Sequence, residues 1–416
     1  MQASLLRLSR MFLAGVTYKF KDQKTMKSLE FNGNGTEYFK IWIINILLTI
    51  ITLGIYYPWA KVRSRRYFFG NTELDNANFE YHATGKQLFF SFLIAMALFV
   101  VYIILSSISP ILSVVLVVIL MLAAPWIIWR SIKFNLRMIS YRNVRFGFNG
   151  NVGGAYSTFL AYPVGMMVAF GIVIAIVMGV IGQVMGMTSI AGLIMGLMLL
   201  FAYPAFFAMI NKISSNYLTN GSHFGQGQFV ADLEFKPFFM IALKGMGLGL
   251  LLAFVAMIVI GLLAYLTIGL DQITSLGEQM QGMEQGVQPS ALFFLLIFAV
   301  YALFILVGIY VLAYFKARHR TYLFGKTTLD NSINFESTLR TNTLFGIMIT
   351  NLLMMVFTFG LAYPWAAVRV YRYLTESIDV EATEGFDGYM SKVGNEGAIG
   401  DELADAFDID VGGIAF

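Results

Sequence analysis

The amino-acid sequence predicts an all-α, polytopic helical membrane protein, and its composition and charge distribution carry this prediction. Of the 416 residues, 58% are hydrophobic and only 12% are charged, whereas an average soluble protein carries about 25% charged residues. The chain therefore lacks the polar side chains that a water-exposed surface requires. Several stretches without Lys or Arg are long enough to cross a bilayer, which takes about 20 apolar residues.

These stretches divide into eight hydrophobic segments. A charged side chain at the bilayer centre is costly, so the segments lie where Lys and Arg are absent. Turn-forming residues divide the three longest stretches near residues 106–110, 183–189 and 271–290. The predicted segments are residues 41–59, 88–106, 111–129, 159–184, 190–210, 238–265, 292–315 and 344–365.

Two basic loops carry the same sequence, which indicates an internal repeat. Residues 61–76 read KVRSRRYFFGNTELDN and residues 316–331 read KARHRTYLFGKTTLDN, with ten identities in sixteen positions. A shorter relation joins residues 52–67 with residues 358–373, and weaker relatives surround Pro125 and Pro204. The predicted repeat unit is an apolar helix, Tyr-Pro-Trp, a basic amphipathic stretch and, in the fuller copies, a polar turn.

The basic stretches are candidate sites for lipid headgroups. Tyr and Trp favour the headgroup level of a bilayer, and guanidinium groups at that level attract lipid phosphates. The candidate residues are Arg63, Arg65, Arg66, Arg318, Arg320, Arg369 and Arg372. Because the stretches are repeated, the alternative interpretation, interfacial anchors without a ligand, is favoured over a unique active centre.

The polar turns of the two fuller copies are expected to reverse the chain tightly. They contain Gly70, Asp75 and Asn76 in the first copy and Gly325, Asp330 and Asn331 in the second. Glycine permits a positive φ, and Asp and Asn side chains bond their own backbone or cap the next element.

Three regions are predicted from the charge distribution. Residues 1–30 carry basic residues and an apolar run too short for a span, so we expect a cytoplasmic or interfacial stretch. Residues 31–375 form the repeat-built helical membrane domain. Residues 376–416 hold 11 of the 24 acidic residues and a single basic residue, so we expect an acidic tail. The rest of the chain then carries a net charge of +14.

Two topologies fit the eight segments. If all eight span the membrane, both tails lie opposite the four basic loops, and the basic residues divide 18 to 10. If residues 41–59 and 344–365 are re-entrant, six spans remain and all 28 basic residues lie on one side. The rule that cytoplasmic loops collect Lys and Arg slightly favours the second topology.

The repeated motif YPWAKVRSRRYFFGNT and the acidic ending DELADAFDID resemble the YjgN family of bacterial inner-membrane proteins, from about Phe31 to Asp410. The resemblance implies a multi-pass protein of the bacterial cytoplasmic membrane. It implies no established activity and therefore supplies no catalytic residues. It also implies a partner, because relatives are often encoded beside a membrane-associated zinc metallopeptidase.

Groups that carry catalysis are sparse. The chain has no Cys, and His82, His223 and His319 lie at no spacing typical of a metal-ligand pair. No Walker loop, GxSxG or HExxH motif occurs. We therefore expect a protein that is not an enzyme and that uses neither a cofactor nor a metal nor a nucleic-acid partner.

Polar residues within the apolar segments are further candidates, since such residues are often functional. They are Asn45, Lys244 and Asn351. Lys244 lies close enough to a helix start to extend to the membrane surface. Asn45 and Asn351 are expected to hydrogen-bond between helices.

Two functions fit these observations. The first is binding or transport of an amphipathic or anionic molecule such as a lipid, held between helical hairpins with the arginines near its head. The second is a non-enzymatic scaffold or regulator of another membrane protein, with the acidic tail as the adaptor. Membrane lipids and a membrane-protein partner are thus expected, and no oligomeric state is predicted.

Overall fold

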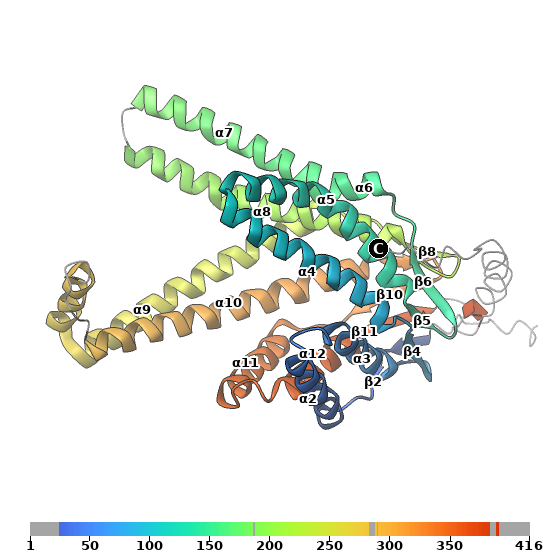
Figure 1. Cartoon of the computed structure of the whole chain (residues 1–416). Coiled ribbons are helices and arrows are strands. Elements are labelled where there is room, and N and C mark those ends of the chain that lie inside the picture. The colour runs from blue at the N-terminus through green and yellow to red at the C-terminus, as the bar shows by residue number, and fades with distance from the viewer. Residues whose placement is uncertain (1–24, 186–187, 283–287, 289, 383–387, 391–416) are drawn as a thin grey trace, which may run out of the picture.

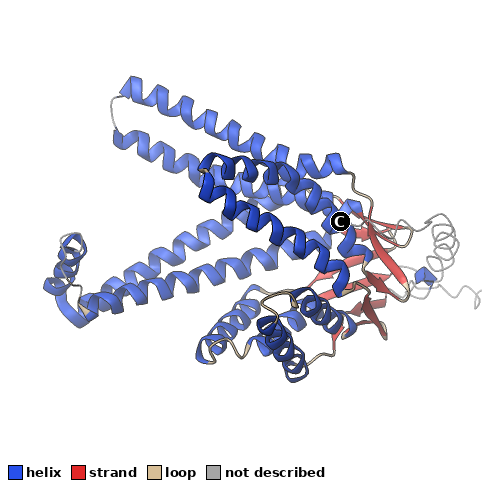
Figure 2. Ribbon diagram, viewed as in Figure 1, coloured by secondary structure: helices blue, strands red, loops and turns tan. Residues whose placement is uncertain are grey.

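The computed structural model describes residues 25–185, 188–282, 288, 290–382 and 388–390. Helices project from one end of the molecule, where all the strands gather (Figures 1 and 2). The helices are α2 (Gly35–Ile51), α3 (Tyr57–Gly70), α4 (Gly85–Ile108), α5 (Pro110–Arg137), α6 (Val152–Tyr156), the π-helical turn η1 (Ser157–Ala161), α7 (Tyr162–Met185), α8 (Thr188–Gly221), α9 (Phe235–Gly282), α10 (Ala291–Gly325), α11 (Thr341–Phe357) and α12 (Tyr363–Glu376). The strands are β1 (Thr25–Ser28), β2 (Glu30–Phe31), β3 (Thr72–Leu74), β4 (Ala77–Tyr81), β5 (Ile139–Tyr141), β6 (Val144–Phe148), β7 (Ser222–Phe224), β8 (Gly227–Ala231), β9 (Thr327–Leu329), β10 (Ile333–Ser337) and β11 (Ile378–Ala382).

The strands form one antiparallel sheet, so the prediction of an all-α fold is wrong. The order of the eleven strands is β1-β11-β10-β9-β8-β7-β6-β5-β4-β3-β2. The two terminal strands of this order, β1 and β2, are consecutive in the chain and separated only by Leu29. β1 pairs with β11, the Leu29 N–H donates to the Ile378 carbonyl at 3.0 Å, and β2 pairs with β3. The sheet therefore closes on itself as a small barrel, and the described strands leave no open edge.

The predicted polar turns are the tips of two β-hairpins of this barrel. Asp75 and Asn76 join β3 to β4 with φ of 48° and 58°, and Asp330 and Asn331 lie between β9 and β10 with φ of 51° and 54°. Two consecutive positive φ values match the twist of a two-residue hairpin turn. Gly70 and Gly325 are not in these turns: each ends a helix, α3 and α10, without a positive φ.

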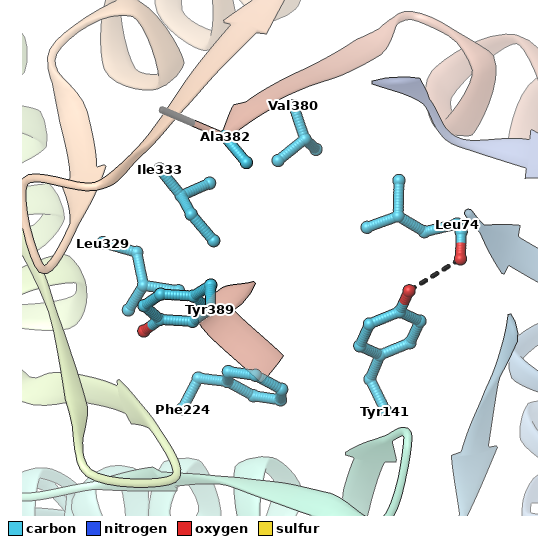
Figure 3. Packing of buried hydrophobic residues seen from close by; sticks show 8 residues of the cluster. All are labelled: Leu74, Tyr141, Phe224, Leu329, Ile333, Val380, Ala382 and Tyr389. Carbon is cyan, nitrogen blue, oxygen red and sulfur yellow. Dashed lines mark hydrogen bonds between the residues drawn. The ribbon is translucent and has the colours of Figure 1, made fainter. Parts of the chain in front are cut away.

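The barrel core consists of apolar side chains in two layers, and Figure 3 shows the first layer together with Ile333, Ala382 and Tyr389. One layer comes from the third residue of each odd-numbered strand from β3 onward, and each of these residues is 3–6% exposed. Its members are Leu74, Tyr141, Phe224, Leu329 and Val380. The second layer contains aromatic rings of the even-numbered strands whose consecutive centroids are 5.8–6.4 Å apart. Its members are Phe79, Phe146, Phe229 and Phe335.

Five helical hairpins alternate with the strand pairs, and each begins and ends at the barrel: α2–α3, α4–α5, α6–α8, α9–α10 and α11–α12. The same position, fourteen residues before the strand that follows the hairpin, is buried in all five. It holds Pro58, Pro125, Ala208, Ala313 and Pro364. Pro204, which also lies in a Tyr-Pro pair, is buried one helical turn before Ala208.

Six of the eight predicted segments lie in helices that are long and apolar enough to cross a membrane. These six candidate spans are Gly85–Ile108, Pro110–Arg137, Val152–Val180, Gly196–Gly221, Phe235–Gly269 and Ala291–Gly325. The protein is therefore a polytopic helical membrane protein that also contains a sheet.

The other two predicted segments, residues 41–59 and 344–365, each turn back. The first bends between α2 and α3, where Leu53 and Gly54 have positive φ, and the second bends between α11 and α12 at Phe359 and Gly360. Both hairpins return to the barrel, so neither segment connects opposite sides of the protein.

The predicted regional boundaries fall inside regular structure. The boundary after residue 30 lies within β2, and the boundary after residue 375 lies within α12. Because β1 pairs with β11, the described parts of both terminal regions belong to the barrel. Residues 1–24 of the N-terminal stretch and residues 383–387 and 391–416 of the acidic tail lie outside the described residues.

Neighbouring hairpins meet where a Trp ring covers a glycine. Trp59 lies against Gly85, the first residue of α4, and Trp365 lies against Gly35, the first residue of α2. In both places a Cβ atom on the glycine would overlap the indole ring. Two Tyr-Pro-Trp motifs therefore fix the contact between one hairpin and the next.

Gly85→Ala is expected to lower the melting temperature of the purified protein, because overpacking costs about 1–3 kcal/mol. Gly70→Ala is the matched control: Gly70 also lies at a helix end, but its Cβ would meet no atom within 4 Å. Thermal unfolding of both variants in detergent checks the prediction. Equal melting temperatures would contradict the Trp59 contact.

Candidate functional site

Four of the five hairpins carry an arginine at one equivalent position, nine residues before the strand that follows. These arginines are Arg63, Arg130, Arg318 and Arg369, while Ile213 occupies the position in α8. The position lies near the barrel end of each helix. Arg130 was not among the predicted site residues, although the Pro125-Trp126 pair before it was a signal for it.

Arg369 and Asn351 bond to each other within the α11–α12 hairpin. The Arg369 guanidinium donates to Asn351 Oδ1 at 3.1 Å, and Asn351 Nδ2 donates to the Ala366 carbonyl at 3.0 Å. Asn351 is 4% exposed. This asparagine thus links α11 to α12 and engages the Arg369 guanidinium in a hydrogen bond.

Asn45 is the equivalent asparagine of the α2–α3 hairpin, but it accepts no hydrogen bond from Arg63. Asn45 Nδ2 lies 3.4 Å from the Ala60 carbonyl, matching the contact of Asn351. Asn45 Oδ1, however, is buried without a hydrogen-bond partner among the described residues. The exposed Arg63 side chain forms no hydrogen bond or ion pair in that part of the chain. Arg63 therefore remains available for an anion.

Four other predicted headgroup residues hold neighbouring parts of the chain together. Arg65 donates to the Tyr81 hydroxyl at 2.8 Å and to Asn135 Oδ1 at 2.6 Å. Arg66, Arg320 and Arg372 each donate to a backbone carbonyl, of Ala83 at 2.9 Å, Leu374 at 2.6 Å and Gly33 at 2.6 Å respectively. Each of these four guanidinium groups therefore has at least one donor engaged within the protein.

Tyrosine hydroxyls latch four hairpins at their base. Each tyrosine lies five residues before the next strand and bonds the backbone where the first helix of its own hairpin begins. The contacts are Tyr67 with Asn34 at 2.8 Å, Tyr217 with Asn151 at 2.8 Å, Tyr322 with Glu234 at 2.9 Å and Tyr373 with Arg340 at 2.9 Å. These contacts were not predicted from the sequence, although the spacing of the four tyrosines from the strands is constant.

An apolar cavity of about 210 Å³ lies between α9 and α10. Its walls include Ala253, Met257 and Ile260 of α9 and Val300, Phe304 and Val307 of α10. Closer to the barrel the same two helices touch, because a Cβ on Gly245 would meet Phe315 and one on Gly249 would meet Val311. The two small residues therefore close the helix pair on the barrel side of the cavity.

Helical periodicity places Arg318 on the α10 stripe that lines this cavity. Val300, Phe304, Val307, Val311, Tyr314 and Arg318 follow one another at intervals of three or four residues. Residues at these spacings lie on one helix face. Arg318 is exposed and forms no hydrogen bond or ion pair with described residues. An unoccupied guanidinium thus stands at the barrel end of an apolar stripe.

Lys244 lies in the third turn of α9 and is exposed. It is nine residues from Ala253, or about half a helical turn beyond two full turns, so it faces away from the cavity. Lys244 therefore does not line the cavity.

A separate polar cluster lies at the hairpin end of the barrel. Lys27 Nζ lies 3.1 Å from Asp75 Oδ1, and Arg142 Nη2 lies 2.9 Å from Asp75 Oδ2. The hydrogen bond from Lys27, supported by Arg142, holds the pKa of the Asp75 carboxyl below its usual value. These ion pairs join β1 to the β3–β4 and β5–β6 hairpins.

His82 lies beside a serine and a glutamate but does not complete a Ser-His-carboxylate relay. His82 Nε2 lies 2.7 Å from Ser140 Oγ and 3.5 Å from Glu80 Oε2. One ring nitrogen makes both contacts, whereas a Ser-His-carboxylate relay uses both nitrogens. Within the described residues, no group of three His, Asp or Glu side chains is placed to hold a metal ion.

The six candidate spans expose their apolar side chains. In the most apolar window of each, 0–12% of the residues are buried inside the protein. Exposed apolar surface of this extent requires lipid around it. The fold therefore defines a multi-pass membrane protein whose helical hairpins are anchored in a β-barrel.

The chain belongs to the family described as bacterial protein of unknown function, DUF898, whose model matches residues 26–406. It is similar to the inner membrane protein YjgN of Salmonella typhimurium strain LT2, with 31% identity over 364 residues that cover 85% of this chain and 88% of the relative. It is also similar to the inner membrane protein YjgN of Escherichia coli O157:H7, with 35% identity over 147 residues, or 35% of this chain and 37% of the relative. No solved structure matches the chain. The protein is thus a multi-pass protein of the bacterial inner membrane.

Proposed function

We propose that this protein binds an anionic phospholipid, with an acyl chain in the cavity between α9 and α10 and the phosphate at Arg318. One observation carries the proposal: the apolar cavity and an unoccupied guanidinium share one face of α10. An acyl chain prefers the apolar walls, and a guanidinium matches the geometry of phosphate oxygens.

The distance along α10 supports a lipid in the leaflet nearer the barrel. Val307 and Arg318 are eleven residues apart, which corresponds to about 16 Å at 1.5 Å per residue. Half of a hydrocarbon core that is about 30 Å thick is about 15 Å. A phospholipid whose phosphate lies at Arg318 therefore extends its chains to the level of the cavity.

Arg63 supports a second contact of the same kind. It occupies the position in α3 that Arg318 occupies in α10, and it too is exposed without a bonded partner among the described residues. The other five predicted headgroup arginines bond within the protein and are assigned to structure. Arg318 is therefore the primary binding site. Transport of the same lipid would begin there.

The proposed role is non-catalytic and uses the membrane itself as the source of ligand. A membrane-protein partner, such as a metallopeptidase, stays a prediction for the acidic tail. In the described part of that tail, β11 and residues 388–390 contact the barrel, and the remainder lies outside the described residues.

Arg318→Gln is expected to reduce retained phosphatidylglycerol about tenfold, because a hydrogen bond to a charged group contributes about 1.5–3 kcal/mol. The protein is purified in mild detergent from membranes that contain phosphatidylglycerol and phosphatidylethanolamine. Bound lipids are then quantified by mass spectrometry. Ala256→Phe, which fills the cavity from α9, is expected to reduce retention of both lipids.

Lys326→Gln is the matched control, because it removes one positive charge just beyond the end of α10, away from the cavity. It is expected to retain lipid like the unchanged protein. Equal retention by Arg318→Gln and Lys326→Gln, or retention unaffected by Ala256→Phe, would overturn the proposed site.

A further inference from the structure

The hairpin end of the barrel is closed by a short piece of the acidic tail, residues Gly388–Met390. Tyr389 is 5% exposed and lies between Leu329 and Phe224 in the barrel core (Figure 3). Its hydroxyl donates to Asp330 Oδ2 at 2.9 Å, and Asp330 Oδ1 accepts from the Gln228 N–H at 2.9 Å. Asp330 belongs to the β9–β10 turn, so Tyr389 enters from the side opposite the membrane helices.

A glycine provides the space for this tyrosine. A Cβ on Gly227, the first residue of β8, would overlap the Tyr389 hydroxyl and the Asp330 carboxylate. The first residues of β4, β6 and β10 are Ala77, Val144 and Ile333, and all three pack against the barrel core. Among the four β-hairpins of the described barrel, the space left by a missing side chain therefore lies only at Gly227, where Tyr389 enters.

The barrel has further room beside Tyr389. An apolar cavity of about 170 Å³ is bounded by the core side chains, including Phe79, Phe146 and Phe229, and by Tyr389 and Met390 themselves. An aromatic ring that enters this mouth thus meets apolar walls, while its hydroxyl meets a fixed carboxylate. This combination is typical of a pocket that recognises an amphipathic aromatic side chain.

Only residues 383–387 separate this tail segment from β11. A ligand tethered by so short a linker has an effective concentration of the order of millimolar. A contact that buries one tyrosine and one methionine can therefore be occupied in the free protein and still open.

We propose that the hairpin-side mouth of the barrel is a peptide-binding site for a tyrosine followed by a methionine, and that Gly388–Met390 is its tethered, exchangeable ligand. Residues 391–416, which follow this ligand in the chain, carry six acidic side chains. The inference is independent of lipid binding, because it uses neither α9, α10 nor Arg318.

The chain contains no cysteine, so one introduced cysteine reports on docking. A nitroxide spin label is attached to Ser391→Cys in the full-length protein. The label is expected to be immobilised in this background and mobile when Tyr389→Ala or Gly227→Val is added. Ala77→Val, which places the same side chain at the equivalent position of β4, is expected to leave the label immobilised.

Exchange is tested by adding an excess of a synthetic peptide that covers residues 384–394. This peptide is expected to increase the mobile fraction at least twofold, whereas the same peptide with Tyr389→Ala is expected to have no effect. A label equally mobile with and without Tyr389→Ala would show that the tail is not docked. Docking that the peptide never displaces would show a permanent structural contact. Either result overturns the proposal.

Discussion

Val380→Asp is expected to abolish the accumulation of folded protein in the membrane. Val380 is 3% exposed and belongs to the core layer that the odd-numbered strands contribute. It lies in β11, which pairs with β10 on one side and β1 on the other. An unpaired carboxylate buried at this position destabilises the folded state by several kcal/mol. That is a large part of a typical free energy of unfolding of about 5–15 kcal/mol. The measurement is the membrane-fraction yield and the size-exclusion profile of a fluorescent fusion.

Asp379→Asn provides the control on the same strand. Asp379 points out of the core and accepts a hydrogen bond from Ser28 Oγ at 2.5 Å. The amide of Asn retains an acceptor oxygen there, so the loss in the free energy of unfolding is expected to stay below about 1 kcal/mol. A Val380→Asp protein with the yield and melting temperature of the unchanged protein would contradict the closure of the barrel through β11.

The helical part of this fold was predictable because its signal is local. Six predicted segments lie in helices long enough to span, since runs such as residues 88–106 contain no charge over the required length. The bends at Gly54 and Gly360 were also foreseeable from glycine followed four residues later by proline. Local composition did not reveal that both hairpins return to a sheet.

The sheet was not predictable because its strands are short and its pairing is non-local. β3 and β5 have three residues each, and β2 has two, which is too few to show an alternating pattern. β1 pairs with a strand more than 340 residues away. The Asp-Asn turns were recognised as reversals, but positive φ at both residues is what makes them hairpin turns.

The candidate site was predictable as a set of arginines but not as individual roles. The three-residue spacing of Arg63 and Arg66, repeated by Arg369 and Arg372, indicated a helix face near the membrane surface. It did not indicate which guanidinium would be used inside the protein: Arg372 bonds a carbonyl 339 residues away, at Gly33, and Arg65 bonds Asn135 of the next hairpin. Contacts between neighbouring hairpins engage these arginines, and only the structure shows those contacts. Arg63 and Arg318 form no hydrogen bond or ion pair with described residues.

A reporter enzyme that is active only in the periplasm is expected to be inactive when fused after Phe416. β1 pairs with β11, so both ends of the main described region lie at the barrel. The described Lys and Arg residues lie in the barrel or in the helix ends that join it, and the hairpin tips have none. Since cytoplasmic segments collect Lys and Arg, the barrel is expected on the cytoplasmic side.

The same reporter inserted after Gly282, in the tip between α9 and α10, is expected to be fully active. This tip carries Asp271, Glu278 and Glu284 and no basic residue. Activity at Phe416 together with inactivity at Gly282 would invert the whole protein. Activity at both positions would instead mean that the α11–α12 hairpin opens and crosses the membrane. That outcome would require the backbone at the exposed Phe359, which bends at the hairpin tip, to straighten into a continuous span.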